Sequence, residues 1–319
     1  DGAIADGDEY DVEFVFISSL DGVADHSIYA TYTKVGSGVV GLTGTTATVI
    51  YFPTLGNLCV RTNTADGISR MSVTSPVLGK LPAGITRAAC ALQIPSAGNR
   101  IGTFIRLPND PNGLAVIVLH GHGSSELEVG WLNSYTPAIW DRLCAAGYTV
   151  VALDCGTTWG NDAVIKRAVD LHSSLVDALG LDPCVFLWGD SMGGGAALTL
   201  IAKRPFPVRA AYVTEPVCDL SLLWSDPSFA TLPTAYNNST AERDDNNPMS
   251  QDAAAFAGVP IAFCASSEDT VIPKANHTDA MRAKLSGVTN TVLFTTTGAH
   301  ASAAAYRPID PAAWFAANI

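Results

Sequence analysis

Basic residues are scarce in this sequence, and they do not gather into runs. The 319 residues include 18 Lys and Arg against 30 Asp and Glu, which gives a formal net charge of −12 at pH 7. An acidic surface repels phosphates and cannot release their counterions, so we expect no binding to nucleic acid. Attachment to an anionic membrane is disfavoured for the same reason. Apolar runs stay well short of the ~20 residues of a membrane-spanning helix, so no membrane span is expected.

Charged residues of both signs are few, at 15% of the chain, whereas hydrophobic residues make up 48%. This composition supplies a large buried core for one large domain or two smaller ones. The seven cysteines form neither a disulfide framework nor a zinc-ligand pattern. Cys155, Cys184 and Cys264 lie in or at the ends of apolar runs, where cysteine acts as a small hydrophobe. Synthesis in a reducing compartment is slightly favoured, with room for one disulfide. The compartment, whether cytoplasmic, secreted or virion-associated, stays open.

Helical periodicity is missing from the first part of the chain, residues 1–84. Its first 26 residues hold eight acids and no Lys or Arg. Short segments rich in Val, Ile, Tyr, Phe and Thr follow, separated by Gly, Asn and Asp, and this pattern is typical of strands. The pattern predicts a small β-rich module that ends in the linker LGKLPAG at 78–84. The strand-like segments cover residues 10–18, 27–35, 46–52 and 58–64.

From residue 85 to 319 the pattern is that of an α/β domain. Two segments near 86–95 and 99–108 favour antiparallel strands, and apolar strands then alternate with helical stretches. Apolar runs without alternation indicate a mostly parallel sheet covered by helices on both faces. The predicted strands are 114–120, 148–154, 184–189, 209–215, 260–266 and 290–296, and the predicted helices are 134–146, 162–179, 192–204, 273–286 and 310–318. Residues 216–259 interrupt this alternation, and an insertion there is a natural lid or pocket wall.

One short motif carries chemistry. Gly189-Asp190-Ser191-Met192-Gly193 fits the pattern G-x-S-x-G between a predicted strand and a predicted helix, the context of a nucleophile elbow. A turn this sharp admits only very small residues two positions away on either side of the serine. Its rival, a phosphate-binding loop, lacks G-x-x-x-x-G-K, and no acidic ribose anchor accompanies it. The pattern therefore predicts Ser191 as a nucleophile displayed above the sheet.

A serine nucleophile needs a base and a group that orients the base. On this architecture they follow the serine in the order acid, then histidine. His300 comes just after the last predicted strand, and Asp269 follows the strand before it. Three other acids stay open as alternatives to Asp269, namely Glu268, Glu215 and Asp219. His277 falls within a predicted helix, where we expect a residue on the helix surface.

The segment VLHGHGSS at 118–125 ends a predicted strand and supplies a candidate oxyanion-hole amide. We expect the N–H of Met192 and that of His122 to be the two donors, with Gly123 as the alternative to His122. His120 is expected to be buried and to hold this loop. A zinc site at His120 and His122 is the rival, but it would leave the serine motif unexplained. Candidate pocket walls, each more often ordinary packing, are Trp131, Tyr135, Trp159 and Trp224.

Taken together, HGHG, GDSMGG, SEDTVIP and GAH in this order resemble the α/β-hydrolase superfamily over roughly residues 85–319. The region looks most like the dienelactone-hydrolase, acetyl-xylan-esterase and prolyl-oligopeptidase-like group of serine esterases. The resemblance implies an α/β-hydrolase fold and a serine carboxylic-ester hydrolase. Ser191 would be the nucleophile, His300 the base and Asp269 its orienter, and the oxyanion donors would be Met192 and His122. No metal or organic cofactor is implied.

The resemblance leaves the N-terminal module unassigned, since residues 1–84 are far shorter than the propeller of prolyl oligopeptidases. Small acidic β modules ahead of hydrolases serve in carbohydrate binding, oligomerisation or phage-tail attachment. We therefore expect an ester substrate, with a polysaccharide or cell-envelope polymer as a candidate carrier. A homo-oligomer or larger assembly through residues 1–84 is a further expectation. The alternatives are a peptidase or amidase with the same triad, and a virion- or cell-wall-associated binding protein with a hydrolase-like domain.

Overall fold

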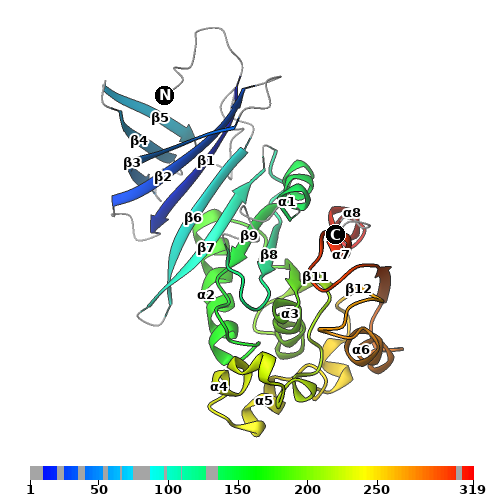
Figure 1. Cartoon of the computed structure of the whole chain (residues 1–319). Coiled ribbons are helices and arrows are strands. Elements are labelled where there is room, and N and C mark those ends of the chain that lie inside the picture. Colours follow the sequence, from blue (N-terminus) through cyan, green and yellow to red (C-terminus); the bar gives the residue numbers. More distant parts are fainter. Residues whose placement is uncertain are drawn as a thin grey trace.

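The structure is a computed structural model, and it describes residues 10–19, 25–34, 40–52, 57–64, 67–74, 87–96, 99–108, 110–126, 136–306 and 311–319. In these residues a 13-stranded sheet runs in the order β13-β12-β11-β10-β8-β9-β7-β6-β1-β2-β3-β4-β5 (Figure 1). The strands are β1 Tyr10–Ser19, β2 Asp25–Lys34, β3 Val40–Phe52, β4 Asn57–Thr64, β5 Gly67–Thr74, β6 Arg87–Ser96, β7 Asn99–Leu107, β8 Ala115–Leu119, β9 Thr149–Leu153, β10 Val185–Asp190, β11 Val208–Thr214, β12 Ile261–Ser266 and β13 Thr291–Thr296.

The strands β8 to β13 form the parallel part of the sheet, in which β11 pairs with β12 and β12 with β13. The hairpin of β6 and β7 joins it through an antiparallel pairing of β7 with β9. This arrangement confirms the predicted α/β class with a mostly parallel sheet. Every predicted strand from residue 114 onward is present, because a continuous apolar run is what a strand covered on both faces needs.

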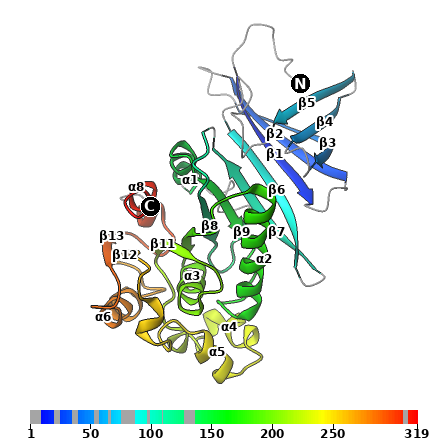
Figure 2. The same cartoon turned by 180° about the vertical axis from the view of Figure 1, so that it is seen from behind.

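Helices cover both faces of the sheet, as Figures 1 and 2 show. A hydrophobic core lies on each face, and alternate residues of β8 contribute to one or the other. Ala115, Ile117 and Leu119 belong to the core under α2, α3 and the insertion. Val116 and Val118 belong to the core under α1, α7 and α8. The helices are α1 Thr136–Ala145, α2 Asp162–Leu179, α3 Met192–Lys203, α4 Thr231–Ala235, α5 Thr240–Asn246, α6 Ala280–Lys284, α7 Ala303–Tyr306 and α8 Pro311–Ala316. None of the helices in the described residues is long and apolar enough to cross a membrane.

Local sequence explains where the longest helix begins and ends. The side chain of Asn161 accepts a hydrogen bond from the N–H of Ala163 at the start of α2, and Gly180 ends the helix with φ 64°. Both are the residue types that cap helices at these positions. The predicted helix 273–286 is instead divided into a π-helical turn at Ala275–Asp279 and the short helix α6.

The strands of the N-terminal region continue the same sheet. β1 pairs with β6 in parallel, and β1 to β5 follow one another as antiparallel neighbours. The predicted linker 78–84 and the predicted boundary at residue 84 lie outside the described residues. A separate N-terminal module therefore stays a prediction.

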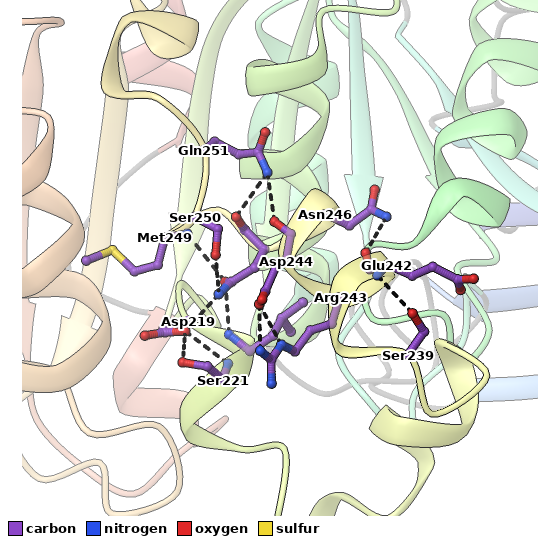
Figure 3. A network of polar contacts seen from close by, with 12 residues as sticks. Asp219, Ser221, Ser239, Glu242, Arg243, Asp244, Asn246, Met249, Ser250 and Gln251 are labelled. Carbon is purple, nitrogen blue, oxygen red and sulfur yellow. Dashed lines mark hydrogen bonds and ion pairs between the residues drawn. The ribbon is translucent and has the colours of Figure 1, made fainter.

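The insertion 216–259 is built from short helices that pack into the core. Besides α4 and α5 it contains 3-10 turns at Leu220–Leu222, Pro227–Phe229 and Ala253–Phe256. Leu232, Tyr236 and Phe256 are fully buried in the core on the α2 and α3 side. Figure 3 shows the polar contacts that hold its middle together, among them those of Asp219 with Ser221 and those of the Gln251 side chain. The insertion is thus a firmly packed part of the domain, and its movement as a lid stays a prediction.

Candidate active site

Ser191 lies at a sharp turn between β10 and α3. Its backbone has φ 50° and ψ −114°, a strained conformation for a residue with a side chain. A Cβ on Gly189 would lie 2.3 Å from the carbonyl oxygen of Gly193, and one on Gly193 would lie 2.0 Å from that of Leu119. Only glycine fits at either position. The structure therefore builds the predicted elbow, because strand and helix meet too closely for any other residue.

Neighbouring strand ends hold the turn on both sides. The N–H of Ser191 donates to the carbonyl of Thr214 at 2.9 Å, and its own carbonyl accepts from the N–H of Val217 at 3.0 Å. Thr214 ends β11, and Val217 is the second residue of the insertion. The conformation of the serine is therefore fixed by the segment that follows the next strand of the sheet.

The side chains of Ser191, Asp269 and His300 meet at the carboxyl ends of β10, β12 and β13, in that order. Nε2 of His300 lies 2.9 Å from Oγ of Ser191, and Nδ1 lies 2.7 Å from Oδ2 of Asp269. With its proton on Nδ1, the ring donates to Asp269 and leaves Nε2 free to accept the hydroxyl proton. Oδ1 of Asp269 accepts from the N–H groups of Val271 and Ile272, both at 2.8 Å, which fix the carboxylate.

A second buried carboxylate reaches the same ring. Oε2 of Glu215, the residue after β11, lies 3.3 Å from Nδ1 of His300 and accepts from the N–H of Ala301 at 2.7 Å. Among the predicted alternatives to Asp269, Glu268 accepts from the N–H of Gly298 and Asp219 from Ser221 and Asn247 instead. Asp269 and Glu215 are therefore the two acids that the described structure brings to His300.

The charges around His300 set its basicity. Burial disfavours the imidazolium, but the hydrogen bond and charge of Asp269, together with the charges of Glu215 and Asp190, outweigh it and raise the pKa of His300 above its ordinary value. Burial disfavours the ionised carboxylate of Glu215 and raises its pKa to about 7, although the hydrogen bond from Ala301 and the charge of His300 act in the opposite direction. The cluster can accept and hold a proton at the position of the imidazole.

Solved structures share this arrangement of strands and helices. An esterase from Pyrococcus furiosus superposes with a TM-score of 0.53 at 21% identity, covering 71% of this chain and 88% of that one. Brefeldin A esterase, a bacterial homologue of human hormone-sensitive lipase, gives 0.54 at 19% identity over 75% and 76%. A puromycin-hydrolysing peptidase from Mycobacterium tuberculosis gives 0.54 at 15% identity over 90% and 56%. The chain has the α/β-hydrolase fold.

Comparisons of sequence match less of the chain than the comparisons of structure do. No family model matches the chain. A curated relative, the 2-hydroxy-6-oxononadienedioate/2-hydroxy-6-oxononatrienedioate hydrolase of Klebsiella pneumoniae, is 39% identical over 97 residues. That match covers 28% of this chain and 32% of the relative, so the chain aligns with about a third of that protein.

The loop after β8, in which an oxyanion-hole donor was predicted, borders the turn at Ser191. A Cβ on Gly121 would lie 3.4 Å from Cβ of Ser191. His120 is buried; its Nε2 accepts from the N–H of Cys155 at 2.9 Å and its Nδ1 lies 2.8 Å from the carbonyl of Gly121, as expected of a residue that holds the loop. The ring of His122 stacks on Trp159, and its Nε2 lies 2.9 Å from Oγ1 of Thr231.

These contacts bear on metal binding. His120 and His122 are engaged with separate partners, which does not favour the rival zinc site. Within the described residues, one set of three side chains is grouped closely enough to hold a metal, namely Glu215, Asp269 and His300. Hydrogen bonds to one another and to backbone N–H groups occupy these atoms and account for the grouping. The donor roles of the Met192 and His122 amides stay predictions.

Of the four candidate pocket residues, two have described surroundings. Trp131 and Tyr135 lie outside the described residues. Trp159 is 2% exposed and packs between His122 and Phe229, and its indole N–H donates to Thr231. Trp224 packs near Tyr236 with the Arg243 guanidinium over its ring. Both are packing residues of the insertion boundary, and direct contact with a substrate stays a prediction.

The prediction for His277 was wrong. It lies in the π-helical turn and is 1% exposed, and its Nδ1 accepts from the N–H groups of Cys218 and Asp219, each at 3.2 Å. Burial lowers the pKa of His277 to about 4. Helical periodicity missed this role, because the two N–H groups it caps belong to the insertion, 58 residues or more away in sequence.

Proposed function

We propose that the chain is a serine hydrolase that cleaves carboxylic esters through an acyl-enzyme. The observation that carries this proposal is the hydrogen-bonded series Ser191, His300 and Asp269, with Nε2 2.9 Å from Oγ and Nδ1 2.7 Å from the carboxylate. These distances are those of a nucleophile, its base and the group that orients the base. The resemblance in fold to esterases and peptidases supports hydrolysis.

The proposed mechanism proceeds in two halves. Oγ of Ser191 attacks the ester carbonyl carbon while Nε2 of His300 takes the hydroxyl proton, and Asp269 stabilises the imidazolium that forms. Amides at the start of α3 and in the loop after β8 would hold the oxyanion; losing one such donor costs about 10²–10³ in rate. His300 then protonates the leaving alkoxide. In the second half it takes a proton from water, which attacks the acyl carbon and releases the acid and free Ser191.

Replacement of the nucleophile tests the proposal. Ser191→Ala should lower kcat for p-nitrophenyl acetate by about 10⁶-fold, the scale seen when a catalytic serine is removed. It should also abolish labelling by a fluorophosphonate. Ser174→Ala is a matched control, since that hydroxyl donates to the carbonyl of Asp170 within α2, outside the proposed site. Retained turnover or labelling in Ser191→Ala would overturn the proposal.

The peptidase alternative has the same triad and differs in the leaving group. Matched p-nitrophenyl ester and p-nitroanilide substrates with one acyl group would separate the two. Since an alkoxide or phenolate leaves more readily than an amine, a pure esterase should show no measurable anilide turnover. A panel of acetyl, longer-chain and feruloyl esters, free and attached to polysaccharide, would then define the acyl group and any polymeric carrier. A protein that is neither labelled nor active on any of these would instead fit the binding-protein alternative.

A further inference from the structure

A carboxylate that the proposed mechanism does not use lies beside the proposed base. The side chain of Glu215 is fully buried. Its Oε2 is shared between the N–H of Ala301, at 2.7 Å, and Nδ1 of His300, at 3.3 Å. Asp269 is the nearer acceptor of the ring proton, at 2.7 Å. The ring therefore has two carboxylates on one nitrogen, and they come from the ends of neighbouring parallel strands, β11 and β12.

The backbone around this contact is unfavourable unless something holds it. Glu215 and Ala301 both have left-handed backbones, with φ 44° and φ 55°. Residues with side chains adopt such conformations at a cost, and they persist only where surrounding contacts impose them. In addition, Oε1 of Glu215 is buried and has no hydrogen-bond partner, which a folded protein rarely tolerates. These three unfavourable features coincide at the contact with the loop that carries His300.

The segment that carries Glu215 also fixes the nucleophile. Thr214, directly before it, accepts from the N–H of Ser191, and Val217, two residues after it, donates to the carbonyl of Ser191. One short segment therefore holds the serine by its backbone and reaches the histidine loop by a side chain. Within the described residues, the Asp269 side chain is instead held by the backbone N–H groups of Val271 and Ile272.

We propose that Glu215 is a second positioning carboxylate for His300: it anchors the histidine loop through the N–H of Ala301 and adds a titratable negative charge beside Nδ1. This inference rests on the proposed role of His300 as the base. It assigns two separable effects to Glu215. The hydrogen bond sets the place of the ring, and the charge sets its basicity.

The charge effect has a definite direction. Burial raises the pKa of Glu215 to about 7, so the group changes its charge in the range where an imidazole works. When ionised, it favours the imidazolium and raises the pKa of His300. The other titratable groups that face this pair are Asp269, Asp190, Cys264 and His277. These titrate together, so the measured quantity is the apparent pKa of the cluster.

Glu215→Gln removes the charge but keeps a carbonyl oxygen for the N–H of Ala301. An opposite charge at this distance shifts a pKa by about 1–3 units, and Glu215 is only partly ionised near neutrality. We therefore expect the acid limb of the kcat/KM profile to move down by about 1 pH unit, with kcat on the plateau within about threefold of wild type. An acid limb that coincides with that of wild type would overturn the charge effect.

Glu268→Gln is the matched control. Glu268 accepts from the N–H of Gly298 in the same loop but is exposed, and the contact described for it is with that backbone rather than with the imidazole. The Glu268→Gln variant also loses one carboxylate charge near the site. Because this carboxylate does not contact the imidazole, we expect the acid limb of its kcat/KM profile to coincide with that of wild type. An equal shift in Glu268→Gln would show a general field effect and overturn the specific role of Glu215.

Glu215→Ala tests the positioning effect, because it also removes the acceptor of the Ala301 N–H. We expect kcat about tenfold below that of Glu215→Gln with KM unchanged, the scale of one lost buried hydrogen bond. Equal kcat in the two variants would overturn positioning.

An NMR titration of the His300 ring separates this inference from the proposed function. In the Ser191→Ala background, the ring pKa should be about 1 unit lower with Glu215→Gln than without it. The titration reports the contact whether or not the protein cleaves esters. If Ser191→Ala retained turnover, the proposed function would fail while the titration still decided whether Glu215 sets the ring. An unchanged ring pKa would overturn the inference alone.

Discussion

The close approach at Gly193 yields the sharpest prediction. A Cβ at this position would lie 2.0 Å from the carbonyl oxygen of Leu119 and 2.6 Å from that of His120. Side-chain carbons practically never come nearer than 3.0 Å to such atoms. Both obstacles are backbone, so no rotamer change relieves them. In Gly193→Ala, the start of α3 and the end of β8 must therefore separate by about 1 Å, the scale on which misplacement alone costs about 10² in rate.

The displaced elements carry the proposed machinery. Ser191 precedes α3, and the loop that carries the predicted oxyanion donor follows β8. We expect kcat/KM for p-nitrophenyl acetate to fall by about 10²-fold or more, and the free energy of unfolding to fall by about 1–3 kcal/mol, as for an overpacked core. Steady-state kinetics and urea unfolding measure the two effects.

Two further glycine variants make the prediction refutable. Gly180→Ala meets no atom within 4 Å but has φ 64°, so it should lose about 1 kcal/mol of stability through backbone strain and keep its activity. Gly121→Ala would place its Cβ 3.3 Å from Oδ2 of Asp190, a milder contact that should cost less than tenfold. Wild-type kcat/KM in Gly193→Ala, or a larger loss in Gly121→Ala, would refute the steric reasoning.

Two other substitutions test the histidines. In Asp269→Asn the amide oxygen should stay with the N–H groups of Val271 and Ile272, so the NH2 group would face Nδ1 of His300 and impose the wrong tautomer; we expect kcat to fall about 10⁴-fold, and a loss under tenfold would contradict this. The pKa of His277 is about 4 when folded and about 6.5 when unfolded. Between these values the unfolded chain binds more protons, so stability falls with falling pH. By pH 4 this removes about 3 kcal/mol of the free energy of unfolding. His277→Asn keeps an acceptor but does not titrate, so urea unfolding should show a smaller loss of stability between pH 7 and pH 4.5 in this variant than in wild type. Parallel losses in both proteins would contradict the assignment.

The parts of the fold that the sequence predicted well are those with an unambiguous local signal. The strands around Ser191 are continuous apolar runs, and the order serine, acid, histidine follows from the order of parallel strand ends. Choosing among four acids was harder, since strand ends β11 and β12 both supply a carboxylate and sequence alone does not show which side chain reaches the ring. In the structure Asp269 and Glu215 both do.

Two features depended on contacts that no local pattern contains. His277 looks like a helix-surface residue because its partners, the N–H groups of Cys218 and Asp219, belong to an irregular insertion. Strand β5, Gly67–Thr74, was not predicted, because its sequence GISRMSVT mixes Gly, Arg and Ser with few apolar residues. Its partner β4 supplies the pairing that its own composition does not indicate.

The root of the insertion limits how a substrate can be admitted. The insertion begins directly after Glu215, and its second to fourth residues are each held: Val217 by the carbonyl of Ser191, and Cys218 and Asp219 by Nδ1 of His277. The Asp219 carboxylate in turn accepts from Ser221 (Figure 3). It also accepts from the side chain of Asn247. A hinge among these residues would break hydrogen bonds to the nucleophile itself and leave buried donors unpaired. Rotation about residues 216–219 would therefore dismantle the geometry that the proposed reaction needs, so we expect this segment to stay in place when a substrate binds.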